Sequence, residues 1–127
     1  MKRKAFYSVI QYCPDMARME CANVGVVLFI PDDGFLGAKI DQGFVRVRKF
    51  FPDANITNLN IAIQAFTNGL HAFEPTKENL QGWIDTRANT LRMTPLRAMT
   101  MNDSPDAEVG CLFQVLVEET HAPVSGN

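Results

Sequence analysis

The residues of this chain best suited to chemistry are Arg18, Glu20 and Asn23, which follow one another closely between two apolar runs. A guanidinium fork, a carboxylate and an amide in one loop could converge on a small polar or anionic ligand. The alternative is structural, with Glu20 and Asn23 hydrogen-bonding the backbone of the loop while Arg18 pairs with an acid. The sequence leaves both interpretations open.

A second set of candidates is basic. Arg92 and Arg97 could join Arg46, Arg48 and Lys49 in one patch if a fourth strand pairs near the third. The alternative is a solvated surface, because the formal net charge is −2 and no aromatic-rich nucleic-acid signature accompanies the arginines. We therefore expect neither nucleic acid nor a membrane as a partner.

Metal and cofactor chemistry lacks its usual signals. The soft ligand candidates Cys13, Cys21, Cys111, His71 and His121 do not form the close pairs of common zinc sites, and no P-loop, GxGxxG, GxSxG or HExxH motif is present. We expect no metal and no cofactor. An odd number of cysteines and no apolar signal segment predict free thiols and a soluble, cytoplasmic protein.

Apolar patterning predicts strands at the start of the chain. Residues 6–12 and 23–30 are rich in β-branched and aromatic residues, and residues 35–41 alternate between apolar and polar after a turn signal at residues 31–34. Residues 96–101 are predicted to form a fourth strand.

Helical periodicity begins at Ile56, from which apolar residues recur at steps of three and four. Asp53 or Asn55 can cap this helix, Thr76 can cap a second one, and Ser104 with the following proline predicts a third. The order βββααβα favours an α+β fold, with an antiparallel sheet of about four strands and helices packed on one face.

Three further expectations concern packing and boundaries. Residues 43–51 fit both a helix and a strand, and we favour a short helix. Alternation places Val24, Val26 and Leu28 on one face of their strand, where we expect them to meet the helix stripe that contains Phe66. Length and composition predict one domain over residues 1–120 and a flexible tail over residues 121–127.

Two segments resemble a known family. The motif residues are Tyr7-Ser8-Val9, Pro14-Asp15, Arg18, Glu20 and Asn23-Val24-Gly25-Val26 in residues 7–29, then Leu91-Arg92, Thr94, Arg97 and Asp103-Ser104-Pro105 in residues 91–117. On these motifs the chain resembles the DUF3037 family of small bacterial and phage-associated proteins of unknown function. It departs from the family at Met19, usually glycine, and at Cys21-Ala22, usually larger apolar residues.

The resemblance implies a function only by association, because members of this family are often encoded beside kinases that look like HipA. Together with the absence of a recognisable catalytic set, this favours a non-catalytic interaction or accessory module, with a HipA-like kinase as its protein partner. The alternative is a small enzyme or anionic-ligand binder that uses Arg18, Glu20 and Asn23. The sequence does not determine the oligomeric state.

Overall fold

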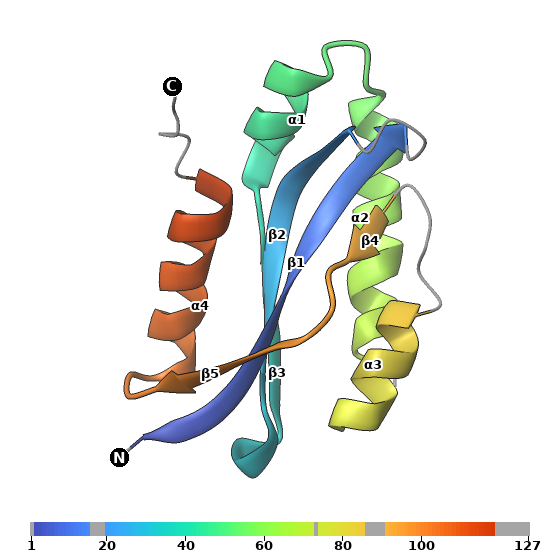
Figure 1. The fold of residues 1–127 in the computed structure, drawn as a ribbon. Coiled ribbons are helices and arrows are strands. Elements are labelled where there is room, and N and C mark those ends of the chain that lie inside the picture. Colours follow the sequence, from blue (N-terminus) through green and yellow to red (C-terminus); the bar gives the residue numbers. More distant parts are fainter. Residues whose placement is uncertain (1, 16–19, 73, 86–90, 119–127) are drawn as a thin grey trace.

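A central antiparallel sheet organises the molecule, with helices on both of its faces (Figure 1). The computed structural model describes residues 2–15, 20–72, 74–85 and 91–118. The α+β class and the antiparallel sheet predicted from the sequence are confirmed. Within the described ranges, no helix is long and apolar enough to cross a membrane.

Five strands form the sheet: β1 (Arg3–Asp15), β2 (Glu20–Ile30), β3 (Phe35–Ile40), β4 (Leu91–Met93) and β5 (Arg97–Met101). Their order is β3-β2-β1, and both β4 and β5 pair with the remaining side of β1. The predicted fourth strand is confirmed as β5. A short additional strand, β4, precedes it along the same edge of β1.

Thr94 joins β4 to β5 without breaking the contact with β1. Its backbone N–H donates to Val9 O at 3.0 Å, and its Oγ1 accepts from Val9 N at 2.9 Å. The buried hydroxyl of Ser8 in turn donates to Thr94 O at 2.6 Å. Side-chain bonds thus replace the regular ladder where Pro95, which has no N–H to donate, interrupts the strand.

The described residues form four helices: α1 (Val45–Phe50), α2 (Ile56–Leu70), α3 (Lys77–Asp85) and α4 (Pro105–Phe113), which continues as a π-helical turn, η3 (Gln114–Glu118). Side chains of Asn55, Thr76 and Ser104 accept the expected capping bonds. Asn55, rather than Asp53, therefore caps α2. The ambiguous segment is confirmed as a short helix, α1, after the 3-10 turn η2 (Gln42–Phe44).

A bulge in β2 reverses the expected alternation of its side chains. Ile10 pairs with Gly25 and Gln11 pairs with Asn23, so Val24 is the extra residue. Val24 consequently points to the same side as Val27, toward α2, whereas Val26 and Leu28 point to the opposite side. The prediction that Val24, Val26 and Leu28 share one face is wrong because a strand changes its alternation at a bulge.

The sheet therefore separates two buried clusters. The larger one joins Val24, Val27 and Phe29 to the α2 stripe, which includes Phe66, and to α3. The smaller one joins Val26 and Leu28 to Val109, Phe113 and Val117 of α4 and η3, together with other residues. Helices on one face were expected; α4 covers the second face, because β2 is apolar on both sides.

Candidate functional site

The predicted polar loop is only partly described. Arg18 lies outside the described residues, and Glu20 is the exposed first residue of β2. Asn23 lies farther along β2 and is half-buried. Convergence of these three side chains on a ligand therefore stays a prediction.

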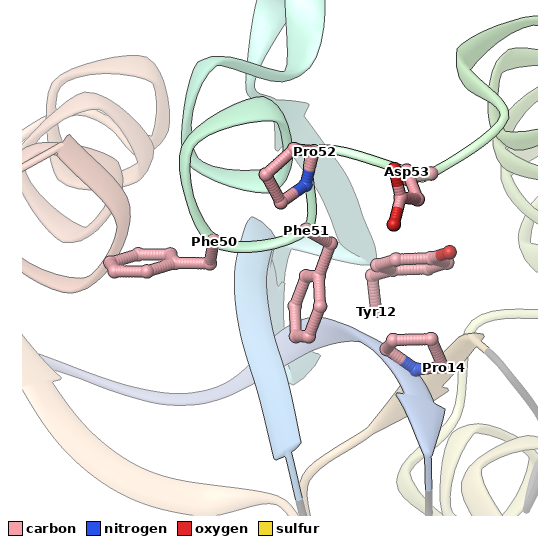
Figure 2. A pocket seen from close by; sticks show the side chains of 7 residues that line it. Tyr12, Pro14, Phe50, Phe51, Pro52 and Asp53 are labelled. Atoms are coloured by element: carbon pink, nitrogen blue, oxygen red, sulfur yellow. The ribbon is translucent and has the colours of Figure 1, made fainter.

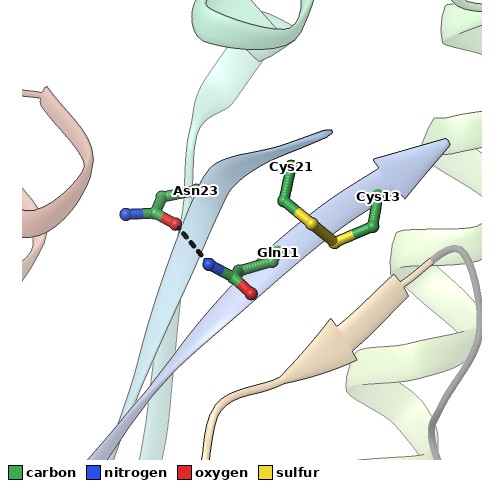
Figure 3. Close-up of a disulfide and its surroundings, with 4 residues drawn as sticks. All are labelled: Gln11, Cys13, Cys21 and Asn23. Atoms are coloured by element: carbon green, nitrogen blue, oxygen red, sulfur yellow. Dashed lines mark hydrogen bonds between the residues drawn. A yellow bond between two sulfur atoms is a disulfide. The ribbon is translucent and has the colours of Figure 1, made fainter. Parts of the chain in front are cut away.

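The Asn23 side chain joins three segments of the fold. Its Nδ2 donates to the carbonyl of Leu116 in η3 at 3.0 Å. Its Oδ1 accepts from Gln11 Nε2 of β1, also at 3.0 Å (Figure 3). The two hydrogen bonds of the Asn23 amide thus fix the packing of η3 against the sheet. Both partners lie outside the polar loop, whereas the structural alternative had Asn23 bonding the backbone of that loop.

The predicted basic patch required the fourth strand to pair near the third, and that pairing is absent. Arg92 lies opposite Gln11 and Arg97 lies opposite Tyr7, both on the β1 edge of the sheet. The third strand, β3, forms the other edge beyond β2. The width of the sheet therefore separates Arg92 and Arg97 from β3. The other basic residues of the predicted patch, Arg46, Arg48 and Lys49, belong to α1, which follows β3 in the chain.

Cys13 and Cys21 form a disulfide across the ends of β1 and β2 (Figure 3). The expectation of free thiols is wrong for this pair, and Cys111 is free and exposed. Beside the Tyr12–Ala22 strand pair, the Cα atoms of the two cysteines lie 4.2 Å apart, the short spacing of opposed antiparallel residues. The sequence signal for this pairing was one cysteine near each end of the loop between the strands predicted at residues 6–12 and 23–30.

A pocket of about 380 Å³ is lined in part by Tyr12 and Pro14, the two neighbours of Cys13 in the sequence (Figure 2). It is formed by the end of β1 and by the end of α1 with the connection to α2. Its lining residues are Tyr12, Pro14, Phe50, Phe51, Pro52, Asp53 and Ala54. None of these lining residues was among the site residues predicted from the sequence, although two adjacent phenylalanines followed by proline were a visible signal.

The pocket is built on an aromatic contact between distant parts of the chain. The rings of Tyr12 and Phe51 meet edge to face, with centroids 5.7 Å apart and an interplanar angle of 81°. Phe51 is held by its own backbone, because its N–H donates to Val47 O at 2.7 Å and its carbonyl accepts from Ala54 N at 3.0 Å. The pocket wall is therefore preformed by regular backbone hydrogen bonds.

Phe50 extends away from the Tyr12–Phe51 pair (Figure 2) and is 49% exposed. The guanidinium carbon of Arg46 lies 5.2 Å from the centroid of its ring, and Lys49 Nζ lies 6.0 Å from it. These cations can stabilise the exposed ring through its quadrupole. They also make the α1 side of the pocket positively charged.

Asp53 supplies the only carboxylate among the residues that line the pocket. It is exposed, and among the described residues it makes no hydrogen bond or ion pair, because Asn55 caps α2 in its place. The lining thus combines apolar rings and prolines with one carboxylate and one phenol. Such a surface can bind an apolar group, but it lacks a nucleophile paired with a base.

In the ranges that the structure describes, no group of three or more His, Cys, Asp or Glu side chains is placed to hold a metal ion. His71 is the exposed residue that ends α2.

Comparison with known proteins gives one result. No curated protein and no solved structure matches the chain. The family described as "Protein of unknown function (DUF3037)" matches residues 7–117, which include β2, the disulfide, the pocket and α4. The resemblance inferred from the sequence motifs is thereby confirmed, and the chain belongs to the DUF3037 family.

Proposed function

We propose that this protein is a non-catalytic interaction module that binds a partner protein through the Tyr12–Phe51 pocket. The observation that carries the proposal is the preformed apolar pocket with the half-exposed Phe50 at its side. Binding energy at protein interfaces is concentrated in a few aromatic anchors and the pockets that receive them. This site supplies both.

The charges around the pocket favour a particular kind of partner. Arg46 and Lys49 flank the Phe50 ring, against the single carboxylate of Asp53. A partner segment that inserts an apolar side chain beside Tyr12 and places acidic residues against α1 would be complementary to this arrangement. We therefore propose an apolar anchor with acidic neighbours as the feature that is recognised.

The family association supplies a candidate for that partner. We propose a HipA-like kinase encoded nearby in a bacterial or phage genome, with both proteins in the cytoplasm. The alternative, a small enzyme or anionic-ligand binder at Arg18, Glu20 and Asn23, gains no supporting observation, since both ends of the Asn23 amide are already hydrogen-bonded.

Co-purification with the neighbouring kinase tests this function. Phe50→Ser should keep the stability within about 0.5 kcal/mol, as is usual for exposed positions, and should abolish co-purification. Ile61→Ser is the matched control, because Ile61 is an apolar residue of α2, 64% exposed and outside the pocket. Retained binding by Phe50→Ser, or equal loss with Ile61→Ser, would contradict the proposed docking site.

The charge of the partner is tested separately. Lys49→Glu should weaken binding and reduce its dependence on salt, since it removes one attractive charge and adds a repulsive one. Lys77→Glu, on α3, makes the same charge change at another exposed lysine. Equal effects of the two variants would indicate a response to net charge rather than recognition at α1.

A further inference from the structure

We propose that Cys13 and Cys21 are a reversible thiol–disulfide site that controls the shape of the neighbouring pocket. The chemistry of the cysteine pair stands on its own geometry, and its effect on partner binding rests on the function proposed above. The bond lies where β1 ends and β2 begins, and the neighbours of Cys13 in the sequence belong to the pocket wall.

The disulfide is connected to the pocket through the backbone of β1. Cys13 lies between Tyr12 and Pro14, and both of these neighbours line the pocket. Figure 3 shows the bond joining β1 to β2 beyond the Gln11–Asn23 hydrogen bond. A change at Cys13 Sγ therefore reaches the Tyr12 ring through one peptide unit.

The pairing of β1 with β2 is irregular around Cys13, so the disulfide contributes more to holding the two strands together there than a bond within a regular ladder would. The register shifts after the pair Tyr12–Ala22, and the next pair is Asp15–Glu20. The disulfide spans this irregular stretch and holds Cys13 against Cys21. Tyr12 itself stays paired with Ala22 and with Leu91. Without the disulfide, the part of β1 after Tyr12 keeps fewer constraints, so Pro14 gains freedom and the surroundings of the Tyr12 ring change.

The two cysteines differ in exposure, which assigns their roles. Cys13 is buried, with 1% of its surface exposed, whereas Cys21 is half-buried. A thiolate of a small dithiol reductant attacks Cys21 Sγ, the Cys13–Cys21 bond breaks, and Cys13 leaves as a thiolate that takes up a proton. The second thiol of the reductant, as its thiolate, then attacks the reductant's first sulfur, which is bonded to Cys21 in the mixed disulfide. Cys21 is released as a thiol, and the reductant becomes a cyclic disulfide.

The cellular compartment decides how such a bond is used. Structural disulfides persist in oxidising compartments, whereas cytoplasmic ones are usually transient and redox-sensing. With the cytoplasmic location proposed above, reduction by dithiols returns the pair to free thiols. Exchange with a small-molecule disulfide, which accepts the two electrons and is itself reduced to two thiols, restores the Cys13–Cys21 bond. The pocket then has two states set by the redox poise.

The first experiment tests the chemistry, in a Cys111→Ser background that removes the exposed third thiol. The oxidised protein should show no alkylated cysteine by mass spectrometry under denaturing conditions, and two after treatment with dithiothreitol. In single variants, Cys21 in Cys13→Ser should be alkylated at least about tenfold faster than Cys13 in Cys21→Ser, because exposure governs access. Two alkylated cysteines after treatment with a mild oxidant, or faster labelling of Cys13, would overturn the assignment.

The second experiment tests the pocket without any partner and without a cysteine substitution in the pair. NMR spectra of oxidised and dithiothreitol-reduced protein should differ at the ring protons of Tyr12 and Phe51. The methyl groups of Val109, in the cluster on the other face of the sheet, should stay unchanged and serve as the control. Unchanged Tyr12 and Phe51 signals would overturn control of the pocket.

Binding of the neighbouring kinase by the two redox forms completes the test. A pocket that changes with redox state, with the kinase bound more tightly by one form, supports both proposals. A pocket that changes while neither form binds the kinase upholds the redox site and contradicts the proposed function. Equal binding by both forms, despite a changed pocket, contradicts redox control of docking alone.

Discussion

The edge-to-face contact of Tyr12 with Phe51 joins the end of β1 to the connection between α1 and α2, with ring centroids 5.7 Å apart. It is the contact on which the pocket is built, and it lies beside the disulfide. A double-mutant cycle with Tyr12→Leu and Phe51→Leu should give a coupling of about 0.5–1.5 kcal/mol in the free energy of unfolding. Additive effects in urea denaturation would show that the rings do not interact.

Phe66 should be the most costly of the α2 positions to truncate. It is buried against the sheet, and its ring meets that of Trp83 with centroids 5.6 Å apart. Phe66→Ala should lower the free energy of unfolding by about 3–5 kcal/mol, because a large cavity remains. Ile61→Ala on the exposed side of α2 is the control, and similar losses at both positions would refute the packing of α2.

Asn23 is expected to be structural. Asn23→Ala leaves the Leu116 carbonyl and the Gln11 amide without their partners, which should cost about 1–3 kcal/mol. Thermal and urea denaturation of the variant measure this cost. A variant as stable as the parent, which has instead lost ligand or partner binding, would return Asn23 to the predicted polar loop site.

Gly25 should tolerate no side chain. A Cβ there would lie 2.8 Å from Lys39 O and 2.7 Å from Ile40 Cδ1. Gly25→Ala should therefore destabilise by about 1–3 kcal/mol through overpacking. Gly82→Ala in α3 meets nothing within 4 Å and should stabilise by about 0.5–1 kcal/mol. Equal signs for the two changes would contradict the close approach of β3 to Gly25.

Local signals were sufficient for most elements. The helix starts at Asn55, Thr76 and Ser104 were readable because capping depends on residues within one turn of one another. The strands were readable because alternation and turn residues act over a few positions. Family membership followed for the same reason, since its motifs are short and contiguous.

Features that depend on pairing between segments were not readable in this way. The face taken by Val24 was decided by a bulge, which exists only once β1 and β2 are in register. The separation of Arg92 from β3 was likewise decided by β4 pairing with β1. Register and strand order depend on long-range contacts, which no local pattern specifies.

By itself, the sequence determined most of the elements, the fold class and the family of this protein. The tertiary structure alone decided that Tyr12 and Phe51 meet, that both of them line a pocket, and that Cys13 is bonded to Cys21. The physical reason is distance along the chain. Side chains that are far apart in sequence gain a common surface only after the sheet and helices have brought their backbones together.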